Sequence, residues 1–503
     1  MQPTDLIFTA VILGPIGFAA SAALAPGRHV SRLAATALVF VAAAAIVLTA
    51  VVAVGGTIGA TVGGWPTPLG IALLADRAAA IMVLMAACVL AAAGVHILIE
   101  DGWYARSPAV WATILFLWAG LNTLFLTSDL FTAYVTLEVT GLAGVALIAL
   151  SGTARALTAQ IRYLLVATGA SLIYLMGVAL IYAVTGRLDG HGLVPEMLIP
   201  VSLSVDGAGI VLAGVTLMTV GLLIKMAAWP LHGWLPPAHT GAVAPVSAIL
   251  SALLVKAAAL FLLRLWTGPF AGIVPPAAPV LLGLLGTGAI VWGSIQALRQ
   301  SRLKPIIAYS TVAQMGYLLV AIPIIAAGMP EAAAEAWSGA VIHALSHGLA
   351  KAALFLAAGS IVVAAGSDHL RVLIGSTRTM PVAMMAIAVA GVSIMGLPPS
   401  AGFLGKWLML RAAMASDAYV WVVPIVGGGF LSAAYMFKIF AYAFRPLPDS
   451  RFQAVADRIL GRRRPALEVV ALLLAFSSIA VGIAGGGILP LTMAEPGWAG
   501  EGR

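Results

Sequence analysis

Apolar segments long enough to cross a lipid bilayer occupy most of the chain. A helix needs about 20 apolar residues to span the hydrocarbon layer. Of the 503 residues, 62% are hydrophobic and only 9% are charged, whereas soluble domains carry about 25% charged residues. The composition therefore predicts an all-α polytopic membrane protein. Candidate spans lie near residues 5–25, 31–54, 74–99, 109–127, 129–150, 161–185, 207–229, 241–265, 277–298, 305–327, 336–364, 381–414, 418–443 and 466–490.

Basic residues are distributed unevenly among the predicted loops. If each loop takes the number of the span it follows, the odd loops hold 16 of the 26 Lys and Arg residues. The even loops and both termini hold only Arg187 and Arg503. The positive-inside rule then predicts cytoplasmic odd loops and outward-facing termini. We expect a multi-pass protein of the bacterial inner (plasma) membrane, in contact with the lipid bilayer. Its net charge of +8 follows from the loop asymmetry and does not indicate nucleic-acid binding.

The sequence offers no sign of a bound cofactor or metal. Cys88 is the single cysteine, which rules out an intrachain disulfide and any cysteine-based metal or iron–sulfur site. No nucleotide-binding or redox motif is apparent. We expect no cofactor, and no enzymatic activity of the chain by itself, so its energy source must be a partner or an ion gradient.

Two spans contain proline clusters next to a lysine. The first runs from Lys225 through Pro230, and the second has Pro398 and Pro399 just before Lys406. Proline breaks a helix, and broken backbone at membrane depth survives only inside protein or beside a wet cavity. Paired interruptions indicate inverted repeats; two ordinary kinks are the alternative. The expected division is 1–108 (helices 1–3), 109–265 and 266–445 (five-helix repeats), and 446–503 (basic inner loop and helix 14).

Four charged residues lie inside apolar runs: Glu138, Lys225, Lys256 and Lys406. Each costs roughly 2.5–3.5 kcal/mol on insertion scales, so we interpret them as groups that move ions or protons. If their spans pack together, Glu138 and Lys225 relieve each other's desolvation. A static structural ion pair is the alternative.

The span at 336–364 carries three titratable residues at intervals of four: His343, His347 and Lys351. This spacing places all three on one helix face. Two histidines at i and i+4 can also bind a metal, but the glutamate of the hydrolase motif is absent and no third ligand is evident. Because histidine titrates near neutral pH, a proton-relay ladder is the better interpretation.

Other polar residues lie at span ends or beside the first interruption. Arg264 and Lys438 are close to span ends, where we expect their side chains to snorkel toward the interface. Asp76 also lies at a span end. His232 and His239 flank the first interruption, where we expect water to reach them.

Four segments follow one another along the chain: FLTSDLFTAYVTLEVTGLAGVALIAL, KMAAWPLHGWLPPAH with APVSAILSALLVKAAALFLLRL, HALSHGLAKAALFLAAGSI, and MGLPPSAGFLGKW. Together they resemble the antiporter-like proton-translocating subunits of respiratory complex I, membrane-bound hydrogenases and Mrp-type cation/proton antiporters. The resemblance covers residues 65–445. Residues 63–77 and 161–189 look most like the D-type subunit of Mrp antiporters, whereas HGWLPPAHTGAVAPVS is closer to the hydrogenase and complex I members.

The resemblance implies about 14 transmembrane helices in two inverted five-helix repeats, with helices seven and twelve discontinuous. It implies a proton-translocating subunit of a multisubunit Na⁺/K⁺–proton antiporter, whose partners are other membrane subunits, protons and monovalent cations. The alternative is a pumping subunit of a complex I-like, hydrogenase or bicarbonate-uptake complex. Lysine at the twelfth-span position fits the D-type subunit. The implied proton path comprises Glu138, Lys225, Lys256 (linking two half-channels), His343, His347 and Lys406 (near an exit).

Two further classes stay open at this point. A standalone transporter of an organic solute would need a substrate cavity with aromatic and polar lining, and activity from this chain alone. A structural scaffold would keep transport in the complex intact when the buried lysines are replaced.

Overall fold

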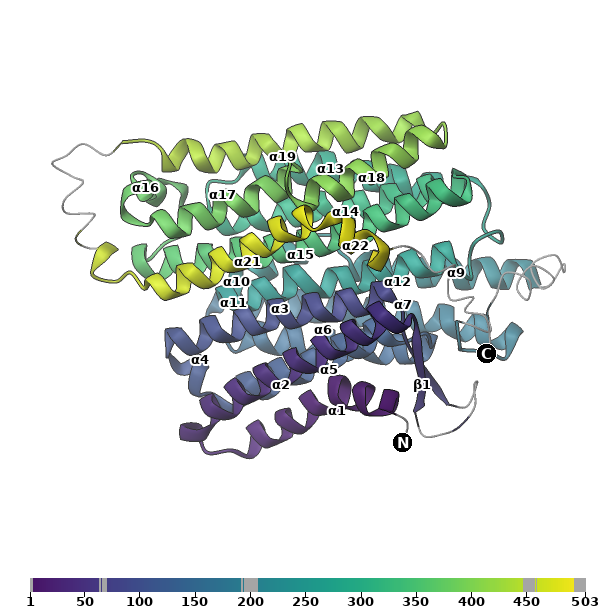
Figure 1. Ribbon diagram of the computed structural model, residues 1–503, viewed down its shortest axis with the longest axis horizontal. Coiled ribbons are helices and arrows are strands. Elements are labelled where there is room, and N and C mark those ends of the chain that lie inside the picture. Colours follow the sequence, from purple (N-terminus) through teal and green to yellow (C-terminus); the bar gives the residue numbers. More distant parts are fainter. Residues whose placement is uncertain are drawn as a thin grey trace.

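The computed structural model describes residues 3–62, 65, 70–190, 193, 207–446, 457 and 459–492 as a bundle of roughly parallel and antiparallel helices (Figure 1). In that part, twelve helices are long and apolar enough to cross a membrane by length and composition. The first six are α1 (Pro3–Leu24), α2 (Gly27–Gly55), α3 (Arg77–Glu100), α5 (Pro108–Leu126), α6 (Leu130–Ala149) and α7 (Ala154–Thr185).

The other six follow the first interruption. One is continuous through a π-helical turn, from α11 (Ala244–Ile249) through η1 (Leu250–Leu254) to α12 (Val255–Thr267). Short helical turns lie between the spans: α4 (Trp103–Arg106), η2 (Leu370–Leu373), α16 (Ser376–Thr379) and η3 (Tyr419–Trp421). The remaining spans are α13 (Ala277–Arg299), α14 (Leu303–Ala327), α15 (Pro330–Ala365), α19 (Val422–Ala443) and α21 (Pro465–Ile483), which α22 (Gly485–Thr492) follows.

The two predicted spans absent from these twelve are the interrupted ones. The seventh forms α9 (Gly207–Lys225) and the short α10 (Leu235–Gly241). The twelfth forms α17 (Pro381–Met395) and α18 (Ala401–Ala415). Both interruptions are therefore confirmed, while the count of fourteen crossings stays a prediction.

Both interruptions begin with the same backbone turn. After α9, the Ala228 amide donates to the Leu223 carbonyl (2.9 Å) and the Ala227 amide to Ile224 (3.0 Å). After α17, Leu397 donates to Val392 (3.1 Å) and Gly396 to Ser393 (3.2 Å). This is the Schellman pattern, which needs a left-handed residue at its centre. Gly396 supplies it at φ +80°, but the first interruption uses Ala227 at φ +56°.

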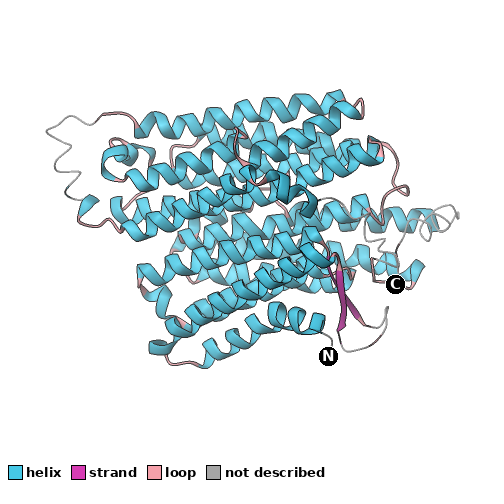
Figure 2. Cartoon of the chain, in the orientation of Figure 1, coloured by secondary structure: helices cyan, strands magenta, loops and turns pink. Residues whose placement is uncertain are grey.

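One element departs from the all-α prediction. Ile58–Val62 (β1) and Ile71–Ala75 (β2) form an antiparallel pair in which Ile58 faces Ala75 and Val62 faces Ile71 (Figure 2). The third span was predicted to begin at residue 74. Instead the Asp76 carboxylate accepts the Ala79 amide (2.6 Å) and caps α3, so the residues before it are free to extend.

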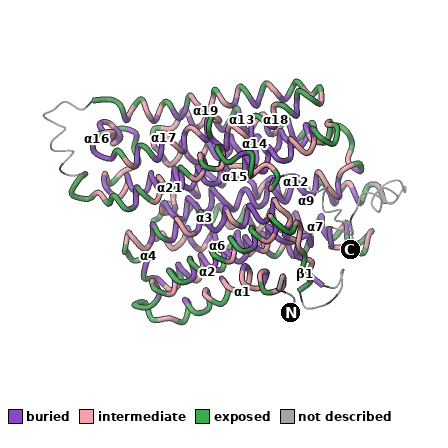
Figure 3. Tube along the Cα trace, in the orientation of Figure 1, coloured by how far each residue is buried: buried purple, intermediate pink, exposed green. Residues whose placement is uncertain are grey.

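The centre of the bundle consists of α12, α14 and α15, whose apolar stretches are mostly buried. Along its edge, most residues of α1 and α2 are exposed or only partly buried (Figure 3). Glycines allow the central helices to approach closely. A Cβ atom on Gly286 of α13 would lie 2.5 Å from the Gly316 carbonyl oxygen of α14. Gly339 of α15 and Gly405 of α18 are equally close. A Cβ atom on either glycine would lie 2.8 Å from the carbonyl oxygen of the other. Small residues are what bring helices together in membranes.

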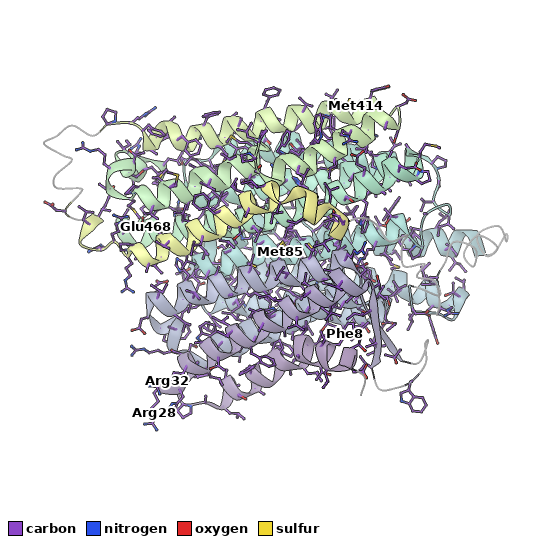
Figure 4. All side chains as sticks on the ribbon, viewed as in Figure 1. Phe8, Arg28, Arg32, Met85, Met414 and Glu468 are labelled. Atoms are coloured by element: carbon purple, nitrogen blue, oxygen red, sulfur yellow. The ribbon has the colours of Figure 1, made fainter. Side chains whose placement is uncertain are left out.

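The odd loops gather at one end of the bundle. Arg28 and Arg32 lie at the same end as Glu468, and α4 and α16 lie there too (Figures 1 and 4). Phe8 and Met414 lie toward the opposite end (Figure 4). Arg28 and Arg32 of the first odd loop therefore lie at the same end as the helical turns α4 and α16 of two other odd loops (Figures 1 and 4).

Replacing Gly286 with alanine is expected to destabilise the α13–α14 contact by about 1–3 kcal/mol, the usual cost of overpacking. The measurement is the melting temperature of the purified protein in detergent. Gly17→Ala is the matched control, because a Cβ atom there meets nothing within 4 Å. Equal melting temperatures for the two variants would contradict the close-contact explanation.

Replacing Ala227 with glycine is expected to stabilise the protein by about 1 kcal/mol, because a residue with a Cβ atom pays roughly 1–2 kcal/mol in the left-handed region. Thermal melting measures the gain. Ala228→Gly, one residue beyond the left-handed position, should give no gain. An unchanged or lower melting temperature for Ala227→Gly would show that the turn carries no such strain.

Candidate proton path

The first interruption brings the predicted carboxylate–lysine pair together. Glu138 lies on α6 and Lys225 is the last residue of α9, with Lys225 Nζ 3.6 Å from Glu138 Oε2. Lys225 Nζ also donates to the Leu137 carbonyl (3.0 Å), and Thr168 of α7 donates to Glu138 Oε1 (3.1 Å). The condition set in the sequence analysis is met at the side chains, with α7 packed against both α6 and α9. The 3.6 Å separation exceeds hydrogen-bond distance, so a small movement opens or closes the pair.

Lys406 is held by the end of the helix on the other side of the second interruption. Its Nζ donates to the Ile394 (3.2 Å) and Met395 (3.3 Å) carbonyls, the last two of α17. The negative end of a helix dipole favours an ammonium group. Lys406 Nζ also lies 4.4 Å from the centre of the Tyr317 ring, a cation–π distance. The described residues show no carboxylate in ion-pair contact with it.

The three residues of α15 lie on one face, as the spacing predicts. The rings of His343 and His347 are 6.0 Å apart, and the Tyr317 ring is 5.0 Å from that of His343. Lys351 donates to the Ile307 carbonyl and the Ser310 hydroxyl of α14. Tyr317 therefore joins Lys406 to the histidines, although the sequence analysis did not select it. An apolar helix commonly holds a packing tyrosine, so only the fold distinguishes this one.

Lys256 is completely buried and follows the π-helical turn η1. Its Nζ donates to the carbonyl of Ser251, five residues earlier and within that turn. The Ser251 hydroxyl in turn lies 2.8 Å from Thr311 of α14. Single π-helical turns frequently occur at functional sites. No hydrogen bond or ion pair in the described part of the chain joins Lys256 to the Glu138–Lys225 pair.

Two buried polar clusters were not predicted. Gln314 of α14 donates through Nε2 to Ser432 (3.0 Å) and Tyr435 (3.3 Å) of α19 and to the Ile394 carbonyl (3.3 Å). Three hydroxyls also meet between α15, α17 and α21, with Ser393 2.6 Å from both Ser346 and Ser478. Isolated serines and glutamines in apolar runs give no sequence signal that they will meet.

Two predictions about flanking residues are wrong. Arg264 does not snorkel; its guanidinium is buried, pairs with Asp76 (2.7 Å) and donates to the Phe125 carbonyl (2.9 Å). Lys438 is partly exposed and donates to the Leu298 carbonyl (2.6 Å) and the Gln300 carbonyl at the end of α13, so its snorkelling stays a prediction. His239 is fully buried, whereas His232 is partly exposed. A backbone carbonyl and a carboxylate compete with water for the Arg264 guanidinium, whereas neither ring nitrogen of His239 has a hydrogen-bond partner.

The contacts of Lys406 predict how its replacement behaves. An ionised glutamate would face two carbonyl oxygens and the negative end of α17, so Lys406→Glu is expected to lower the free energy of unfolding by about 2 kcal/mol. Lys406→Gln keeps an N–H donor, so its free energy of unfolding should fall by less than that of Lys406→Glu. The melting temperatures of both variants in detergent test this order. Equal losses would contradict the role assigned to the helix end.

Residues 127–432 match the family described as NADH:quinone oxidoreductase/Mrp antiporter, TM. An NADH-quinone oxidoreductase subunit N of Desulforudis audaxviator is 36% identical over 422 residues, 82% of this chain and 81% of that protein. The D-type subunit of a Na(+)/H(+) antiporter of Alkalihalophilus pseudofirmus is 30% identical over 387 residues, 76% of this chain and 75% of that protein.

Solved structures give the same result for the fold. A chain of the Mrp complex from Dietzia sp. DQ12-45-1b superposes with a TM-score of 0.85 at 25% identity, covering 98% of this chain and 96% of that one. A chain of respiratory complex I from Thermus thermophilus has a TM-score of 0.72 at 24% identity, covering 95% and 98%. The protein therefore belongs to the NADH:quinone oxidoreductase/Mrp antiporter family of multi-pass membrane proteins.

Proposed function

We propose that this protein is the proton-translocating subunit of a multisubunit Na⁺/K⁺–proton antiporter. The observation that carries the proposal is the set of buried titratable side chains between the two interrupted helices. Protons would move along Glu138, Lys225, Lys256, His343, His347 and Lys406. The identity to a D-type antiporter subunit and the fold of an Mrp complex chain support this proposal. The partners would be the other membrane subunits of that complex.

The proposed mechanism uses the loose Glu138–Lys225 pair as the switch. When the pair is closed, the carboxylate favours the protonated form of the lysine. When it opens, the lysine more readily gives its proton to the next group, because a charge without a partner in hydrocarbon is costly. Neighbouring groups that interact this strongly titrate as a unit. A movement of about an ångström between α6 and α9 would therefore bias the whole path.

A second candidate function is a proton-pumping subunit of a redox-driven, complex I-like assembly. The 36% identity to an NADH-quinone oxidoreductase subunit N supports it, as does the similarity of HGWLPPAHTGAVAPVS to that branch. The same path would then be driven by a partner's redox reaction. The genes beside this one distinguish the two, since small antiporter subunits and quinone-reductase subunits differ in sequence.

The chain is proposed to lie in the bacterial inner membrane with its odd loops in the cytoplasm and its termini outside. The loop charges and the common location of Arg28 and Arg32 support this orientation. Two inverted repeats, 109–265 and 266–445, are also proposed. The matching turns at Ala227 and Gly396 support them, because each ends the first half of an interrupted span.

Replacing Lys225 with arginine tests the mechanism directly. Arginine keeps the positive charge beside Glu138 but does not release its proton. We expect an assembled complex whose cation-dependent proton transport falls about tenfold or more, since a positioned proton-transfer group contributes at least that much. Transport is measured in inside-out vesicles carrying the complete set of subunits, and assembly on native gels.

Lys225→Ala and Glu138→Ala should also abolish transport. Arg106→Ala is the control, because it removes an exposed ion pair with Asp101. Normal transport by Lys225→Arg would mean that the pair is structural and that the proposed switch is wrong.

A further inference from the structure

Gln314 is not part of the proposed path, although it contacts three other helices from the middle of α14. Its side chain is only 1% exposed. The Nε2 amide faces three acceptors, which are the Ile394 carbonyl of α17 (3.3 Å) and the Ser432 (3.0 Å) and Tyr435 (3.3 Å) hydroxyls of α19. Because an amide nitrogen carries only two hydrogens, the three acceptors compete for them.

The Ile394 carbonyl joins Gln314 to Lys406. The same oxygen that accepts the Gln314 amide also accepts Lys406 Nζ at 3.2 Å. The main-chain carbonyl of Gln314 in turn lies 3.2 Å from His343 Nε2 on α15. Hydrogen bonds that share an atom polarise one another in a low-dielectric interior. The Gln314 amide therefore reduces the electron density that the Ile394 oxygen offers to the ammonium group.

The titratable groups that face Lys406 are rings and not carboxylates. They come from the helices packed against α18: Tyr317 of α14, His343 and His347 of α15, and Tyr435 of α19, which reaches Lys406 through Gln314. Among the carboxylates on those helices, Glu331 is exposed at the start of α15. Glu335 pairs with Arg411 (3.2 Å) and Glu468 of α21 pairs with Arg463 (2.5 Å). The groups around Lys406 thus supply dipoles to it and no counter-ion within the described residues.

The first interruption has the same arrangement with a charge in place of the amide. The two helices α6 and α14 share the pattern Ala-Tyr-x-Thr with a glycine five residues after the threonine, at 133–141 and 308–316. Each helix places a polar side chain against the residue two positions before the left-handed turn, Glu138 against Lys225 and Gln314 against Ile394. A carboxylate therefore faces the first helix end, and a neutral amide stands in the matching place at the second.

We propose that Gln314 is a positioning residue for Lys406. As a neutral amide it holds the end of α17 in place and leaves the lysine without a counter-ion, so the lysine releases its proton readily. A carboxylate at this position would favour the charged lysine. An apolar side chain would leave the Ile394 oxygen to the ammonium group alone. The proposal rests on the proposed function, in which Lys406 stands at the end of the path, and Gln314 itself carries no proton.

The first test measures the pH profile of cation-dependent proton transport in inside-out vesicles. Gln314→Glu should move the profile by about one pH unit toward alkaline pH, because a carboxylate one carbonyl away favours the protonated lysine. Gln314→Met, which keeps the length but has no amide, should give a smaller shift in the same direction. Gln296→Glu, at a half-buried position of α13, is the matched control and should leave the profile unchanged.

A merely structural role would lower the amount of assembled complex on native gels without moving this profile. Unmoved profiles for Gln314→Glu and Gln314→Met would therefore overturn the role of Gln314. If Lys225→Ala still abolishes transport in that case, the proposed function stands. Normal transport by Lys225→Ala as well would overturn both proposals.

The second test does not depend on transport. Melting temperatures in detergent at neutral pH are compared for the wild type, Gln314→Glu, Lys406→Gln and the double variant, as a double-mutant cycle. The new glutamate should lower the melting temperature more in the Lys406→Gln background than in the wild type, because a buried carboxylate that loses its cation is strongly destabilising. Additive changes would show that the two side chains do not interact and would overturn the proposal.

Discussion

An ammonium group inside a membrane protein must be solvated by the protein itself, and backbone carbonyls perform that task here. The chain has six lysines, and each donates to at least one main-chain oxygen. Of the six, Lys225 alone also has a carboxylate in ion-pair contact within the described residues. A carbonyl stabilises the charged form but carries no full charge of its own. The lysines are therefore held in place and still able to lose a proton.

Free carbonyls are scarce in a regular helix, because all but the last four are already bonded. Three of the six lysines donate to carbonyls at helix ends or in the π-helical turn. The end of α17 supplies two carbonyls to Lys406, the π-helical turn supplies one to Lys256, and the end of α13 supplies two to Lys438. Lys225 and Lys351, by contrast, donate to carbonyls within the regular helices α6 and α14.

Lysine and arginine occupy different parts of the molecule, and the reason is the same chemistry. All but a few of the arginines lie in the loops, where permanent charge orients the chain. Arg264, an exception, is paired with a carboxylate and remains a fixed charge. Lysine, which loses its proton more readily, occupies the interior. The interior positions of Lys225, Lys256 and Lys406 could be predicted from sequence because a charge within twenty apolar residues stands out.

The sequence by itself determined the spans, the two interruptions and the face shared by His343 and His347, because hydropathy, proline and helical periodicity act locally. It left open whether Glu138 and Lys225 would meet, because their pairing depended on how two separate spans pack. Only the tertiary structure decided that Asp76 would pair with Arg264, that three serines would meet between α15, α17 and α21, and that His96 would line a cavity. These contacts join residues far apart in the chain. Their geometry depends on how glycine-lined helices pack, which no local pattern records.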